Sequence, residues 1–78
     1  MDALGLIREF LGERLSVEPD RVVPEAELAR LGVDSLMLLE LMFEFEDRFG
    51  LEIPSNRGSP RTVGEVVTLI GGLRGAPR

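Results

Sequence analysis

The chain has 78 residues, 44% of them hydrophobic, and a formal net charge of −5. This length allows one small domain, and a domain of about 60 residues buries only about 60% of the surface of its unfolded chain. The sequence contains no cysteine, histidine, tyrosine, tryptophan or lysine, which excludes disulfides and thiolate metal sites, and we expect neither an independent enzyme nor a metal site of the chain's own.

The first predicted element is a helix over residues 2–15, with Asp2 as its N-cap. Apolar residues recur there at helical spacing: Leu4, Ile7, Leu11 and Leu15, with Phe10 widening the stripe. A long loop follows, because Pro19 and Pro24 interrupt regular structure. We expect its valines to pack across the core and a short helical turn to form over residues 25–31.

Residues 35–49 form the second predicted helix, with Asp34 as N-cap and Gly50 as the glycine that ends it. One side carries a core stripe: Leu38, Leu41, Met42, Phe45 and Phe49. The opposite side carries Leu36, Glu40, Phe43 and Asp47, with Glu44 beside them. Large apolar side chains among carboxylates indicate an exposed contact surface.

The chain then runs extended over residues 51–54, and residues 55–61 (SNRGSPR) allow at most one irregular turn. Thr62 and Glu65 form a capping-box pattern that opens a last helix over residues 62–73. The elements predict a single all-α domain over residues 1–78. We expect a small three-to-four-helix bundle with a long first loop and a third helix that is short or irregular.

Charge is distributed unevenly along the chain. Residues 1–56 carry thirteen acidic residues and five arginines, a net −8, whereas residues 57–78 carry one acidic residue and four arginines, a net +3. An acidic body repels nucleic acid and anionic membranes and attracts proteins with basic surfaces. No signal peptide or membrane span is visible. We therefore expect a free-standing, monomeric cytoplasmic protein that does not bind nucleic acid.

The segment Gly32-Val33-Asp34-Ser35-Leu36 closely resembles the attachment motif of acyl and peptidyl carrier proteins. The resemblance extends over nearly the whole chain. It includes the first helix, Leu28–Gly32, Glu40-Leu41, Phe49–Pro54, and the Thr62-Val63 helix start. It implies a bundle of the acyl-carrier-protein type that is not itself an enzyme.

The resemblance implies that Ser35 carries 4′-phosphopantetheine in a phosphodiester bond, transferred from coenzyme A by a separate phosphopantetheinyl transferase. Acyl or aminoacyl groups would then be carried as thioesters on its thiol. A serine at a helix N-terminus suits this role, because free N–H groups and the helix dipole favour an anion. The resemblance also implies that Asp34 helps to orient the transferase's divalent metal. Asp and Ser are common helix caps, so on local evidence alone both residues could be purely structural.

The family uses the matching helix to dock its enzymes, which implies a partner-binding face made of Leu36, Met37, Glu40, Phe43, Glu44 and Asp47. The partners implied are the transferase and acyl- or aminoacyl-loading, synthase and thioesterase-type enzymes with basic surfaces. Binding of this kind is expected to be brief and salt-sensitive. The alternative for the same residues is that isolated apolar side chains are ordinary on a protein surface and the acids only solvate the helix.

Two departures from fatty-acid-type carriers point to the cargo. Met37 stands where those carriers usually have an acidic residue, and the SNRGSPR segment replaces an acidic third helix. Phe45 and Phe49 are expected to face inward and leave little room for a long acyl chain. We therefore expect a short, polar, aminoacyl or polyketide-type cargo, in polyketide, nonribosomal-peptide or specialised lipid biosynthesis instead of housekeeping fatty acid synthesis. The alternative function is an unmodified helical adaptor that docks a basic partner through Leu36 and Phe43.

Overall fold

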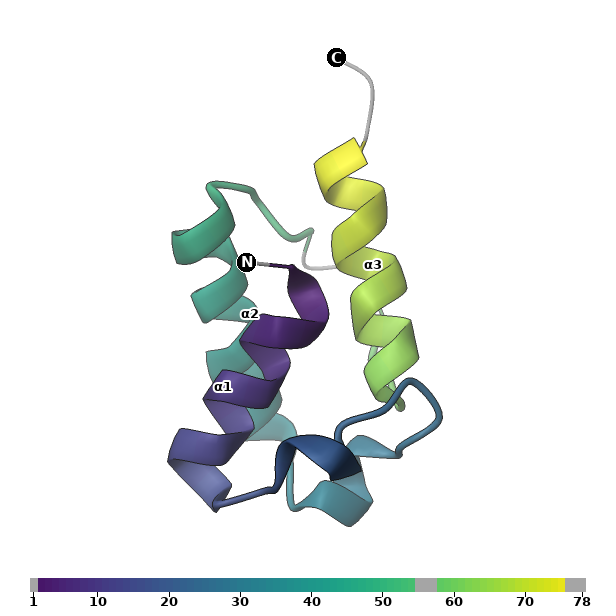
Figure 1. Cartoon of the computed structure of the whole chain (residues 1–78). Coiled ribbons are helices and arrows are strands. Elements are labelled where there is room, and N and C mark those ends of the chain that lie inside the picture. The colour runs from purple at the N-terminus through teal and green to yellow at the C-terminus, as the bar shows by residue number, and fades with distance from the viewer. Residues whose placement is uncertain (1, 55–57, 76–78) are drawn as a thin grey trace.

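The computed structural model describes residues 2–54 and 58–75. Three α-helices are α1 (Ala3–Leu15), α2 (Ser35–Phe49) and α3 (Val63–Gly75). Two 3₁₀ turns, η1 (Pro19–Arg21) and η2 (Leu28–Leu31), lie in the connection between α1 and α2. Figure 1 shows α2 and α3 running in one direction and α1 in the other. The all-α fold predicted from the sequence is confirmed.

The four-helix form of the prediction is not supported, because the described residues form three α-helices. Residues 58–61 of the SNRGSPR segment are not helical, and residues 55–57 lie outside the described residues. The predicted turn over residues 25–31 is also shorter than expected. Its helical part is only η2, because Glu27 adopts extended geometry and forms an isolated bridge with Thr62 instead.

Local polar contacts set the helix ends. The Asp2 side chain accepts a hydrogen bond from the Gly5 N–H at 2.7 Å and caps α1. Gly50 ends α2 in the left-handed region, with φ of 64°, where a side chain would be strained. At the start of α3, the Thr62 hydroxyl accepts a hydrogen bond from the Glu65 N–H, as the capping-box pattern predicts. The reciprocal bond differs from the pattern, because the Glu65 carboxylate accepts from the N–H of Arg61 and not from that of Thr62.

The long first loop is attached to the bundle by apolar and polar contacts. Val17 and Val22 are buried, as expected for loop valines that cross the core, whereas Val23 is exposed. The Arg8 guanidinium of α1 donates to the Val22 carbonyl at 3.2 and 3.3 Å. These contacts hold the loop across the end of the bundle where α2 begins.

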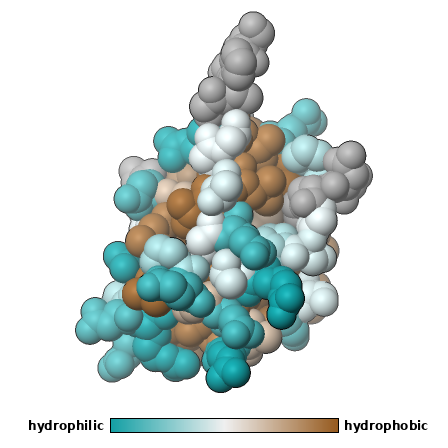
Figure 2. All heavy atoms as spheres, turned by 90° about the vertical axis from the view of Figure 1, so that its right-hand side faces the viewer, coloured by the Kyte–Doolittle hydropathy of each residue, from teal (hydrophilic) through white to brown (hydrophobic). Residues whose placement is uncertain are grey.

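The core lies between the three helices and is entirely apolar among the described residues. Its fully buried large side chains are Ile7, Leu11, Val22, Leu41, Phe45, Val63, Val66 and Ile70. Phe45 packs edge-to-face on Phe49, with ring centroids 5.3 Å apart, and the Arg74 guanidinium lies 4.2 Å from the Phe49 ring centroid. On the α3 side of the molecule, shown in Figure 2, apolar surface is interrupted by polar side chains.

The two phenylalanines of α2 that differ most in burial provide a test of this core. Phe45 is 0% exposed and Phe43 is 57% exposed. Phe45→Ala is expected to lower the free energy of unfolding by about 3–5 kcal/mol, because it leaves a cavity in the core. Phe43→Ala is the matched control and is expected to change it by no more than about 0.5 kcal/mol. Urea denaturation followed by circular dichroism measures both, and similar losses would contradict this packing.

Candidate functional site

The start of α2 is a sharp corner built by its neighbours in the sequence. Gly32 ends η2 in the left-handed region, with φ of 97°, and Val33 is buried. Asp34 is extended and its carboxylate accepts from the Met37 N–H at 2.8 Å, which confirms it as the N-cap. Ser35 is therefore the first residue of α2 and stands at the turn of the chain.

Ser35 is exposed, and within the described residues its hydroxyl forms no hydrogen bond. The backbone N–H groups of Ser35 and Leu36 belong to the first turn of α2, where no intrahelical acceptor exists. An anion attached to the Ser35 oxygen would lie beside these donors and the positive end of the helix dipole. The free N–H groups and the helix dipole at this corner therefore favour an anion on the serine oxygen.

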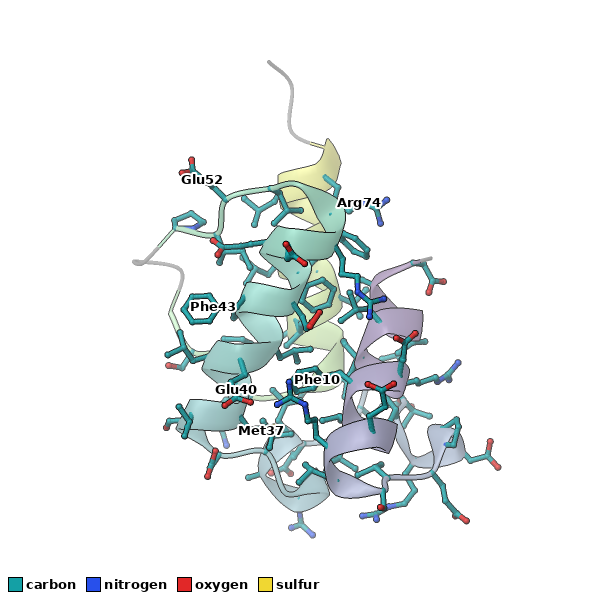
Figure 3. All side chains as sticks on the ribbon, turned by 90° about the vertical axis from the view of Figure 1, so that its left-hand side faces the viewer. Phe10, Met37, Glu40, Phe43, Glu52 and Arg74 are labelled. Atoms are coloured by element: carbon teal, nitrogen blue, oxygen red, sulfur yellow. The ribbon has the colours of Figure 1, made fainter. Side chains whose placement is uncertain are left out.

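An apolar ridge runs along α2 away from Ser35. Leu36 is 64% exposed, Leu39 42% and Phe43 57%, and we name these three residues the α2 ridge. Figure 3 shows Phe43 projecting away from the bundle. Leu36 and Phe43 lie on the exposed side predicted for them. Leu39 was missed, although its spacing of three from Leu36 and four from Phe43 places it on the same side of the helix.

The acidic residues beside the ridge differ in their contacts. Glu40 forms an ion pair with Arg14 of α1, whose guanidinium also lies 4.7 Å from the Phe10 ring centroid. Arg48 contacts Glu9 at 3.0 Å and Glu44 at 3.5 Å, and its hydrogen bond with Glu9 raises the pKa of this guanidinium. Two of the three predicted docking carboxylates are thus already paired within the chain.

Asp47 and Met37 complete the predicted partner face, and the structure places them differently. Asp47 is exposed and, within the described ranges, forms no ion pair. Met37 is half-buried and packs against the core, so it contributes less to the surface than the sequence pattern suggested. Figure 3 shows Met37 and Glu40 lower on α2 than Phe43, nearer the start of the helix. The predicted face therefore divides into an exposed ridge and a flank that is engaged with α1.

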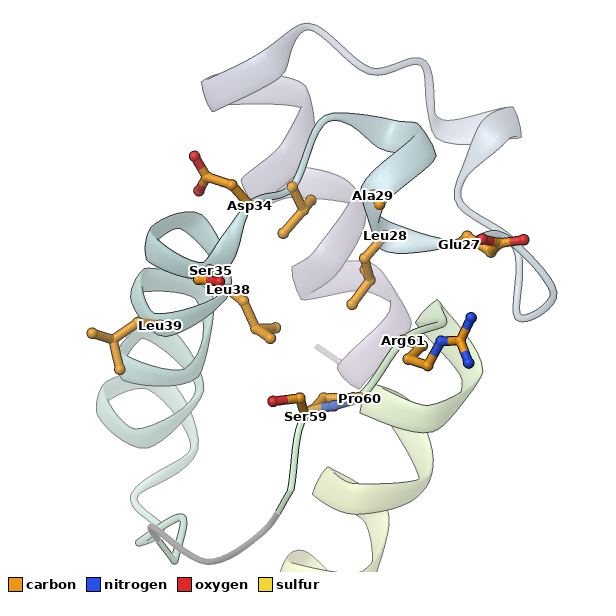
Figure 4. A pocket seen from close by; sticks show the side chains of 11 residues that line it. Glu27, Leu28, Ala29, Asp34, Ser35, Leu38, Leu39, Ser59, Pro60 and Arg61 are labelled. Atoms are coloured by element: carbon orange, nitrogen blue, oxygen red, sulfur yellow. The ribbon is translucent and has the colours of Figure 1, made fainter.

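A cavity of about 460 Å³ opens beside Ser35. Its lining comes from the start of α2, from η2 and its flanking residues, and from the segment before α3: Glu27, Leu28, Ala29, Val33, Asp34, Ser35, Leu38, Leu39, Ser59, Pro60 and Arg61. Figure 4 shows Ser35 on one side of this cavity and Arg61 with Glu27 on the other. This volume lies within the range of about 300–1,000 Å³ typical of ligand sites. The sequence pattern did not predict this cavity, because residues 27 and 61 come together only through tertiary packing.

Two further properties bear on the chemistry of the corner. In the described ranges, no three carboxylates gather closely enough to hold a metal ion. None of the helices in this part of the chain has the length and apolar character needed to cross a membrane. Taken with the contacts described above, the start of α2 brings together the exposed Ser35 hydroxyl, the adjacent Asp34 carboxylate, the cavity and the α2 ridge.

Comparisons with known proteins show what this sequence is similar to. A family model described as "Phosphopantetheine attachment site" matches residues 5–70, which include all of the site residues described above. A curated relative, the acyl carrier protein of Zymomonas mobilis subsp. mobilis, is 46% identical over 56 residues. That alignment covers 70% of this chain and 72% of the relative.

Proposed function

This chain belongs to the acyl carrier protein family, and we propose that Ser35 is the residue to which its 4′-phosphopantetheine is attached. The observation that carries this assignment is the exposed Ser35 hydroxyl at the start of α2, beside free N–H groups and without an internal hydrogen-bond partner among the described residues. The protein carries acyl groups on this prosthetic group and is a carrier, not a catalyst. A cytoplasmic location and a monomeric state remain part of the proposal.

Attachment and loading are separate steps with different roles for the chain. In attachment, the Ser35 oxygen forms a bond to phosphorus, the pyrophosphate bond of coenzyme A breaks, and adenosine 3′,5′-bisphosphate leaves. The hydroxyl proton passes to a base of the transferase. When attached, the prosthetic group would supply the thiol that this cysteine-free chain lacks, and acyl groups would be held on that thiol as thioesters.

We also propose a short, polar, aminoacyl or polyketide-type cargo, in polyketide, nonribosomal-peptide or specialised lipid biosynthesis. The packing of the core supports a short cargo, because Phe45 is fully buried and closed off by the Phe49 ring. The cavity beside Ser35 is bounded by Leu28, Val33 and Leu38, and none of the fully buried residues of α3 lines it. The cavity described above therefore lies at the mouth of the bundle, beside Ser35.

The α2 ridge supports docking of the transferase and of loading, synthase and thioesterase-type enzymes. Three apolar side chains exposed in one row next to the attachment residue form a contact surface that the fold leaves uncovered. The proposed face comprises Leu36, Met37, Glu40, Phe43, Glu44 and Asp47, to which the structure adds Leu39. Because Glu40 and Glu44 are paired internally, Asp47 is the acid of this face most open to a basic partner.

The attachment site is tested with two serine variants. Ser35 and Ser59 both line the cavity, so Ser59→Ala is a matched control for Ser35→Ala. After incubation with coenzyme A, Mg²⁺ and a broad-specificity transferase, intact mass is expected to show one added phosphopantetheine on the wild type and Ser59→Ala, and none on Ser35→Ala. Modification of Ser35→Ala would refute the assignment. An unmodified wild type with several transferases would favour the alternative of an unmodified adaptor docking through Leu36 and Phe43.

Asp34 is proposed to help orient the transferase's divalent metal in addition to capping α2. Asn is as good an N-cap as Asp, so Asp34→Asn keeps the cap and removes the charge. We expect this variant to be modified more slowly while its unfolding free energy stays nearly unchanged. Asp34→Ala is expected to lose about 1 kcal/mol of stability as well. If Asp34→Asn is modified at the wild-type rate, Asp34 is a cap only.

Docking is tested through the specificity constant kcat/KM of phosphopantetheine transfer. Phe43→Ala is expected to lower it about tenfold, the effect of losing an apolar anchor worth more than about 1 kcal/mol. Val23→Ala removes an exposed apolar side chain from the loop and is expected to have no effect. Asp47→Asn is expected to weaken the salt dependence more than Glu40→Gln, because Glu40 is paired with Arg14. Equal losses for Phe43→Ala and Val23→Ala would contradict docking at the ridge.

The size of the cargo is tested by loading acyl groups of increasing length and recording backbone amide chemical shifts. Short acyl groups are expected to shift amides around the cavity, such as Leu38, and to leave those of the core unchanged. Large shifts at Phe45 and Ile70 with a long acyl chain would show that the chain enters the core, and would overturn the proposal of a short cargo.

A further inference from the structure

Two ion pairs join α1 to α2 along one side of the bundle, and their polarities are opposite. Near the start of α2, the Arg14 guanidinium of α1 contacts the Glu40 carboxylate of α2. Near the end of α2 the order is reversed, since Arg48 of α2 contacts Glu9 of α1 at 3.0 Å. Arg48 also contacts Glu44, one turn before it on α2, at 3.5 Å. We name these five residues the α1–α2 seam.

The seam lies next to the α2 ridge. Glu40 stands four residues after Leu36 and three before Phe43, and side chains at these spacings are neighbours on the surface of a helix. Figure 3 shows Glu40 at about the height of Phe10 of α1, lower on α2 than Phe43. A protein that covers the ridge would therefore reach Glu40 with the edge of its docking surface.

Two contacts hold Arg14 in place beside Glu40. Its guanidinium forms the ion pair with Glu40 and also lies 4.7 Å from the centroid of the Phe10 ring, within the range of a cation–π contact. Phe10 is buried in the core, so its ring offers the guanidinium a fixed position. Both members of the ion pair remain accessible, with side-chain exposures of 46% for Arg14 and 39% for Glu40. A cation that approaches from another protein therefore meets a carboxylate whose charge Arg14 already compensates.

Asp47 provides the contrast on the same helix. It is exposed, it stands four residues after Phe43 and, in the part of the chain that the structure describes, it forms no ion pair. One cation opposite Asp47 therefore gains an uncompensated acid. A continuous row of cations along the ridge gains less, because the cations nearer the start of α2 would lie beside the two arginines of the seam, and like charges placed together disfavour a partner.

We propose that Arg14 determines docking specificity: it compensates Glu40 within the chain and disfavours partners that dock through a row of basic side chains. The preferred partner covers the α2 ridge with an apolar surface and presents a single cation to Asp47. This inference rests on the docking of partner enzymes at the α2 ridge proposed above. Arg14 acts on docking through Glu40, so its removal is expected to make that carboxylate available to a basic partner.

The first test observes Glu40 directly and uses the peptide hexa-arginine as a probe for a row of basic side chains. The peptide is titrated into the full chain while the side-chain carboxyl ¹³C shifts of Glu40 and Asp47 are recorded. In the wild type we expect the Asp47 signal to move and the Glu40 signal to stay nearly unchanged. In Arg14→Gln we expect the Glu40 signal to move as well, with peptide binding tighter by up to about fivefold, the upper value for an exposed ion pair.

Arg21→Gln is the matched control, because it changes the net charge by the same amount and Arg21, in η1, belongs to no ion pair among the described residues. It is expected to leave the Glu40 signal as unresponsive as in the wild type. Arg14→Lys keeps a cation at this position and is expected to restore part of the wild-type response. The proposal would be overturned if Glu40 moved equally in the wild type and Arg14→Gln, or if Arg21→Gln and Arg14→Gln tightened binding equally.

The second test measures the docking of an enzyme, a broad-specificity transferase chosen for a basic docking surface. At low salt, Arg14→Gln is expected to lower the KM of phosphopantetheine transfer by up to about fivefold relative to Arg21→Gln, with kcat unchanged. The difference is expected to disappear at high salt, and in the double variant Arg14→Gln/Glu40→Gln, which lacks the freed carboxylate.

Equal KM values for Arg14→Gln and Arg21→Gln, or a gain that persists in the double variant, would overturn the role of Arg14 in docking. A wild type that is not modified at all would refute the attachment at Ser35 instead. The peptide titration does not depend on that attachment, so it still decides whether Arg14 compensates Glu40.

Discussion

Three backbone hydrogen bonds between the first loop and the start of α3 determine the shape of the functional end of this protein. Leu28 donates to Arg61, Val63 to Ala26 and Gly64 to Pro24, each at 2.9 Å. A Cβ at Gly64 would lie 3.0 Å from the Pro24 carbonyl oxygen, so any other residue there would require the Pro24 backbone to shift by a few tenths of an ångström. Because these bonds join segments about 35 residues apart in the sequence, they hold η2 against α3 and leave the cavity open between both of them and α2.

The two sides of α2 differ in how far the rest of the chain covers them. α1 and α3 bury Leu41, Met42 and Phe45, and no other element in the described part of the chain covers the α2 ridge. This division was largely predictable from sequence, since helical periodicity assigns residues to sides of a helix. The cap at Asp34 and the position of Ser35 were predictable for the same reason, because capping is a local interaction between residues close in the chain.

Contacts between elements were not predictable in this way. The pairing of Glu40 with Arg14 depends on the register of α1 against α2, and no local pattern encodes that register. The cavity and the place of Arg61 at its rim depend on how the segment before α3 returns to η2. The capping-box pattern predicts that the Glu65 carboxylate accepts from the Thr62 N–H, whereas it accepts from the Arg61 N–H. The pattern could not predict this difference, because a carboxylate can reach either of two neighbouring N–H groups and packing selects between them.

The fixed backbone of Arg61 has a consequence for how readily a bound group leaves. A residue in a flexible loop loses both backbone and side-chain freedom when it binds, whereas here the backbone is already ordered by Glu65 and Leu28. An anion at the rim would immobilise only the side-chain rotamers, an entropic cost of about 2 kcal/mol, roughly equal to the gain from a partly exposed charged hydrogen bond. Because these terms nearly balance, the bound and the released states of such an anion would be populated to a similar extent.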